Sequence, residues 1–177
     1  HSDDDFGDFS YLHEPSDSSL LWDAVRVMAR LLKAAKALGA GGALAWRDHQ
    51  RAAKKRARDI QFTRGRPRRV QLYRELIRTT RATLAYLHQA AAQLATTDWA
   101  VALWQAKVDH YRPLIEQIIA QTERRVLAGE AVPAGDKLVS LFEPHADIIR
   151  KGREVTYGHK LNLTTGKSGL ILDLAIE

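Results

Sequence analysis

The 177-residue chain contains no cysteine. This absence excludes disulfide frameworks, thiolate zinc sites, iron–sulfur clusters and a cysteine nucleophile. Long apolar runs are also lacking, because none approaches the roughly 18 to 20 residues that a membrane-spanning helix needs. The first residues are acidic, whereas a secretory signal begins with basic ones. These absences predict a soluble cytoplasmic protein with no membrane partner.

Positive charge is concentrated in one segment. The chain carries a net charge of +6, but residues 47–81 hold thirteen basic residues against three acidic ones, a local net of +10. A helical basic stripe there continues directly into a basic turn with glycine and proline, a layout that suits phosphate backbones. The predicted DNA-binding residues are Lys54, Lys55, Arg56, Arg58, Arg64, Arg66, Arg68 and Arg69. The plainer alternative is the solvated face of a helix followed by a soluble loop.

Four helices are predicted between residues 16 and 130. The serines at Ser16 and Ser18 supply helix-starting chemistry before a run of apolar residues at helical spacing, which stops at the glycines from Gly39 onward. A mostly polar helix is expected over 44–62, and Pro67 marks the first turn of the next. That helix carries a near-heptad apolar stripe from Tyr73 to Leu94, typical of packing against another long helix. The fourth follows a break at 96–98 and runs to about residue 129, with Pro113 as a kink position.

Strands are predicted after residue 131, where the helical period disappears and β-branched residues become common. Residues 137–142 form one expected strand. Residues 157–164 and 170–176 form two more, joined by a hairpin through 165–168. A chain that ends on a strand predicts truncation, because a strand edge needs a partner or a cover. The fold class predicted is α+β and mostly helical.

Short motifs for other chemistries are incomplete. Gly166-Lys167-Ser168 lacks the earlier glycine of a phosphate-binding loop, since position 161 is leucine. His13-Glu14 lacks the second histidine of a metalloprotease helix, since position 17 is aspartate. The seven histidines do not occur in ligand-like pairs. No metal ligand can therefore be assigned from these motifs.

Two sequence blocks carry a family resemblance. Residues 13–27 read HEPSDSSLLWDAVRV, and residues 137–152 read KLVSLFEPHADIIRKG, followed by YGHK at 157–160 and GLILD at 169–173. In this order the blocks resemble bacterial insertion-sequence transposases of the ISNCY type, which belong to the DDE class. The resemblance extends from about His13 to Glu177.

The resemblance implies a catalytic domain built on a ribonuclease-H-like sheet. Three acidic residues of this domain bind Mg²⁺, and the domain cuts and joins transposon ends in DNA. The organisation implied is an acidic, frayed N-terminus at 1–15, a helical insertion at 16–130, and the start of a truncated sheet at 131–177. Counting back nine residues from His13 assigns the first catalytic aspartate to Asp4. Asp173 belongs to the hairpin and not to the triad. Because the later acidic residues are missing, the chain is expected to be inactive and to bind no Mg²⁺ tightly.

The first hypothesis is therefore an incomplete DDE transposase that binds DNA without cutting it. The second is a non-enzymatic nucleic-acid-binding helical module. The third is a helical interaction domain that pairs with another chain, such as a second copy, through the stripe from Tyr73 to Leu94.

Overall fold

The computed structural model describes residues 16–40, 45–94 and 98–143, and the backbone of four strands between residues 147 and 176. Four long helices dominate it: α1 (Asp17–Ala37), α2 (Gln50–Phe62), α3 (Arg66–Gln93) and α4 (Trp99–Thr122). A π-helical turn, η2 (Glu123–Leu127), extends α4, and a short 3₁₀ turn, η3 (Ala134–Asp136), follows. The predicted helical character is confirmed.

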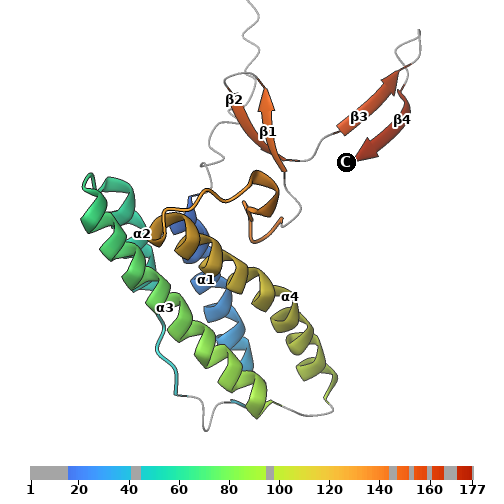
Figure 1. Ribbon diagram of the computed structural model, residues 1–177. Helices are drawn as coiled ribbons and strands as arrows, with labels where there is room; N and C mark the ends of the chain where they lie inside the picture. The colour runs from blue at the N-terminus through green and yellow to red at the C-terminus, as the bar shows by residue number, and fades with distance from the viewer. Residues whose placement is uncertain are drawn as a thin grey trace, which may run out of the picture.

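Helix α1 is the centre of the bundle, since it contacts α2, α3 and α4 (Figure 1). Its start is fixed by the predicted serine chemistry: the Ser16 hydroxyl accepts from the Ser19 amide at 3.2 Å, and the Ser19 hydroxyl accepts from the Ser16 amide at 3.0 Å. Its end is marked by Gly39, whose φ of +111° suits glycine. The apolar positions of α1 are buried on several sides, which its central place requires.

Helix α3 runs beside α1 in the same direction, and α4 runs back antiparallel to both (Figure 1). The apolar stripe of α3 forms the contact with α1, because Leu76 and Leu87 are fully buried and Tyr73 is 7% exposed. From α4, the Trp104 indole donates to the Leu31 carbonyl of α1 at 2.9 Å. The stripe predicted to pack against a long helix does so within this chain, and it is not free to pair with a second one.

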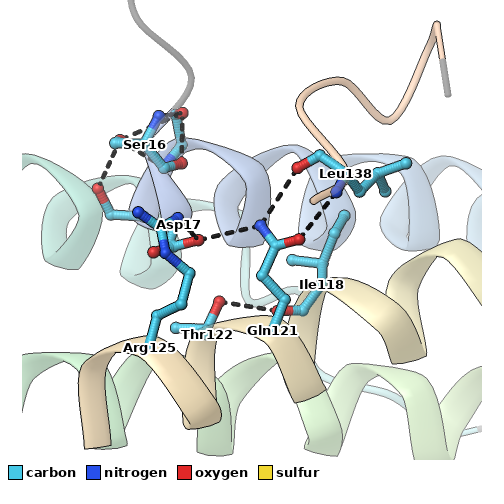
Figure 2. A network of polar contacts seen from close by, with 9 residues as sticks. Ser16, Asp17, Ile118, Gln121, Thr122, Arg125 and Leu138 are labelled. Carbon is cyan, nitrogen blue, oxygen red and sulfur yellow. Dashed lines mark hydrogen bonds and ion pairs between the residues drawn. The ribbon is translucent and has the colours of Figure 1, made fainter. Parts of the chain in front are cut away.

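The loop after η2 packs onto the helices instead of starting a sheet. Val132, Leu138, Val139 and Leu141 are all buried. The strand predicted for 137–142 is wrong, because a side chain occupies the hydrogen-bonding groups that a neighbouring strand would use. Gln121 of α4 accepts from the Leu138 amide at 2.9 Å and donates to the Leu138 carbonyl at 3.2 Å (Figure 2).

The predicted ribonuclease-H-like sheet is also wrong. The described part of residues 16–143 contains no strand, and the later strands form two separate antiparallel pairs. β1 (Asp147–Lys151) pairs with β2 (Glu154–Gly158), and β3 (Leu161–Thr165) pairs with β4 (Ile171–Ile176). The β3–β4 pair corresponds to the expected hairpin, whereas the expected strand over 157–164 is divided between β2 and β3. Two-stranded pairs cannot supply the multi-stranded mixed sheet that the resemblance implies.

Candidate nucleic-acid interface

The eight predicted DNA-binding residues lie on α2, on the turn at 63–65 and on the first turn of α3. Seven of them are exposed: Lys54, Lys55, Arg58, Arg64, Arg66, Arg68 and Arg69. None of these seven forms an ion pair with a carboxylate in the part of the chain that the structure describes. We call these seven residues the basic face.

Arg56 is different, because it is half-buried and paired. Its Nε lies 3.0 Å from Glu75 Oε2 on α3. The hydrogen bond from Arg56 lowers the pKa of Glu75, so the carboxylate is ionised at neutral pH. Arg56 therefore links α2 to α3, and its predicted part in binding DNA is restricted by this pairing.

Small residues on α2 explain why its cations point outward. Ala53, Ala57 and Ile60 are buried against α1 and α3, so the opposite side of the helix must face solvent. Lys54 and Arg58 are four residues apart and lie on one helical face. The Arg58 guanidinium lies 5.9 Å from the centre of the exposed Phe62 ring, a cation–π contact that holds it over the end of the helix.

A groove of about 700 Å³ lies beside the basic face and is lined by Arg47, Asp48, His49, Arg51, Ala52, Lys55, Arg56 and Thr79. His49 Nδ1 lies 2.9 Å from the Thr83 hydroxyl of α3. Burial, helped by the nearby charge of Arg47 and opposed by that of Asp48, lowers the pKa of His49 below its ordinary value of 6.5. The imidazole is therefore neutral at neutral pH, and the positive charge of the groove comes from arginine and lysine.

The turn between α2 and α3 is held by Arg69. Its Nε and Nη2 donate to the Thr63 carbonyl at 3.3 and 2.9 Å. The Thr63 hydroxyl in turn donates to the Asp59 carbonyl at 2.7 Å. These bonds fix the direction in which the chain leaves α2, and they place Arg64 and Arg66 next to the end of α4.

A second depression, of about 370 Å³, lies at this point and is lined by Arg64, Arg66, Arg69, Val70, Tyr73, Arg125 and Val126. We call it the arginine pocket. Arg125, on η2, donates from Nη1 to Asp17 Oδ1 at 3.0 Å, and the Asp17 side chain is 7% exposed (Figure 2). Sequence reasoning missed Arg125, because it lies 44 residues beyond the basic segment and only the folding of α4 against α1 and α3 brings it there.

The carboxylates predicted for catalysis cannot be placed at a site. Asp4, the one catalytic aspartate assigned in this chain, lies outside the described residues, and Asp173, which the resemblance assigns to the hairpin and not to the triad, is on β4, of which only the backbone is described. Among the residues that the structure describes, no three His, Asp or Glu side chains are close enough to hold a metal ion. The Mg²⁺ implied by the resemblance therefore has no fitting ligand set there.

An apolar groove of about 920 Å³ lies between α1 and α4, and it is larger than the groove beside the basic face and the arginine pocket. Trp99 and Leu103 line it and are 73% and 56% exposed, and Phe142 is 47% exposed at its edge. The Arg26 guanidinium lies 5.7 Å from the centre of the Phe142 ring. Among the residues that the structure describes, this groove is exposed whereas the stripe of α3 is buried.

Comparisons of the chain with models of protein families, with curated proteins and with solved structures found no match. Within the described residues, no helix is both long enough and apolar enough to cross a membrane.

Proposed function

We propose that this chain binds the phosphate backbone of DNA through its basic face, as part of a protein that acts in DNA transposition. The observation that carries the binding proposal is the set of seven exposed cations on α2, the following turn and the start of α3, without ion-paired carboxylates among the described residues. Such an array gains free energy by releasing counterions from DNA, and it contacts phosphates without reading the base sequence. The proposal concerns binding and not strand cutting.

The assignment to transposition is supported by the two sequence blocks that resemble DDE transposases. Asp17 comes from the first block and Leu138 from the second, and Gln121 bonds both: its Nε2 donates to Asp17 Oδ1 at 3.1 Å and to the Leu138 carbonyl at 3.2 Å (Figure 2). Gln121 thus joins the start of the helical unit to the loop that follows it, so the two blocks lie side by side. Translation of the flanking DNA tests this assignment, because further acidic transposase motifs are expected there, and unrelated flanking sequence contradicts it.

The salt dependence of binding tests the proposed interface. We expect duplex DNA of any sequence to bind, with the logarithm of the binding constant falling by about 0.9 per log unit of salt for each phosphate neutralised. Replacing Lys54, Lys55 and Arg58 with alanine should reduce this slope by about 2 to 3. Fluorescence anisotropy at several salt concentrations measures it.

The matched control removes the same charge elsewhere. Arg30, Lys36 and Lys107 are exposed on α1 and α4 and do not belong to the basic face. Their triple alanine variant should keep nearly the wild-type slope. Equal losses in the two triple variants would show that the protein attracts DNA only through its net charge, and would contradict the proposed interface.

A further inference from the structure

The arginine pocket brings together four guanidinium groups without a carboxylate in its lining. Arg64, Arg66 and Arg69 come from the turn and the start of α3, and Arg125 comes from η2. Asp17 offsets the charge of Arg125, but Arg64, Arg66 and Arg69 have no carboxylate partner among the described residues, so the pocket keeps an excess of positive charge that attracts an anion. The lining therefore favours a bound anion.

Two of the four arginines are held in place by bonds inside the protein. Arg69 is fixed by the Thr63 carbonyl, and Arg125 is fixed by the buried carboxylate of Asp17. A guanidinium has five N–H donors, so both groups keep donors for a ligand. Arg66 reaches the same end of α4, since its Nη2 lies 3.6 Å from where a Cβ on Gly129 would be. Groups fixed in advance lose little conformational entropy when a ligand binds.

The start of α3 adds to the positive potential. Its N-cap is Gly65, which has no side chain to accept from the first amides of the helix. Those amides, with the positive end of the helix dipole, favour an anion beside them. The Tyr73 ring closes the pocket behind them, and it is 7% exposed. At about 370 Å³, the pocket lies at the lower end of the range for small-molecule sites.

We propose that the arginine pocket seats a single phosphate of the DNA backbone, with Arg125 and Arg66 as binding residues that grip it from opposite helix ends. This inference rests on the proposed DNA binding and adds to it a fixed contact point. A planar guanidinium fork can bond two phosphate oxygens at once, which a lysine cannot do. The bound phosphate would fix the position of the duplex on the protein surface, whereas the contacts made by α2 allow the duplex to shift.

The test uses Arg66→Gln and Arg125→Lys, with Arg124→Gln as the matched control. Arg124 is next to Arg125 in sequence, is exposed, and pairs with Glu130 outside the pocket lining. Arg125→Lys keeps a positive charge beside Asp17 but loses the fork, so the fold should be retained, and the thermal unfolding midpoint checks this. Two ligands are titrated into the full chain: inorganic phosphate, followed through the arginine Nε–H resonances, and duplex DNA, followed by anisotropy.

We expect saturable shifts of the Arg66, Arg69 and Arg125 resonances on adding phosphate. Arg66→Gln and Arg125→Lys should each weaken phosphate and DNA binding about tenfold, while Arg124→Gln should weaken them far less. Equal effects of all three variants would overturn the proposal that the arginine pocket binds a phosphate. Loss of phosphate binding with unchanged DNA binding would also overturn the proposal, because the pocket would then serve a free phosphate.

These results can be separated from failure of the broader proposal. If the α2 triple variant keeps the wild-type salt slope, the interface on α2 is wrong whatever the pocket does. If the α2 triple variant lowers the salt slope but the pocket variants do not weaken binding, the proposal of DNA binding is retained and the proposal of a phosphate bound in the pocket is wrong.

Discussion

Gln121 shows how a single side chain determines the path of the chain. Its amide is buried and makes three hydrogen bonds, two with the backbone of Leu138 and one with Asp17 (Figure 2). A buried side-chain amide whose hydrogen bonds are all formed holds a loop in one position. The same polar groups, buried without hydrogen-bond partners, would lower the stability of the fold. The loop at 132–141 is therefore tied to α4 and α1 at this point.

Replacing Gln121 with leucine should lower the free energy of unfolding by about 2 to 4 kcal/mol, because the Leu138 amide and carbonyl would be buried without partners. Denaturation by urea, followed by circular dichroism, measures the change. The control is Gln117→Leu, since Gln117 is exposed and makes a single bond of 3.4 Å to the Asp136 carbonyl. Similar losses for both variants would show that the Gln121 bonds contribute little.

At the scale of elements, the apolar stripe of α3 is an internal contact. Leu87 is fully buried in the cluster that α3 shares with α1. The heptad-like spacing correctly predicted a helix packed on a helix. It could not say which helix, because a partner in the same chain and a partner in another chain leave the same pattern of apolar residues.

Leu87→Ala should therefore lower the free energy of unfolding by about 2 to 5 kcal/mol and leave the oligomeric state unchanged. Urea denaturation and light scattering measure the two quantities. The control is Leu103→Ala on α4, because Leu103 is 56% exposed and its loss should cost much less. A change of oligomeric state in the Leu87 variant would support pairing between chains through α3.

The other elements show where periodicity is reliable. α1, α3 and α4 have long apolar stripes, α1 and α4 also have side-chain caps, and the structure contains all three near the predicted bounds. The second helix begins at Gln50 and not at residue 44, since residues 45–49 are not helical. The segment 137–142 has the composition of a strand, but Gln121, sixteen residues earlier, takes the hydrogen bonds that would make it one. Local sequence does not contain that information.

At the scale of the whole molecule, charge and fold are coupled. The basic segment has a net charge of +10, whereas all other residues of the chain together sum to −4. A polyanion that binds only the folded arrangement of these cations stabilises the fold by mass action.

We expect duplex DNA at about 100 times its dissociation constant to stabilise the folded protein by about 2.7 kcal/mol. Thermal unfolding of the helices, followed at 222 nm with and without DNA, measures this as a higher midpoint. At the same DNA concentration, the triple variant of Lys54, Lys55 and Arg58 should show a much smaller increase. A midpoint that does not rise in the wild type would indicate that DNA binds the unfolded chain as well.

The sequence by itself determined the helices, the cap at Ser16 and the concentration of cations between residues 47 and 81. These features depend on neighbours a few residues apart, through helical spacing, capping and local composition. Only the tertiary structure decided that Arg125 joins Arg66, that Leu138 bonds to Gln121 instead of a strand, and that the stripe of α3 is buried against α1. Each of these results joins residues that are distant in the chain. The first two form because the antiparallel return of α4 brings its C-terminal end beside the starts of α1 and α3, and the third forms because α3 packs directly on α1 (Figure 1).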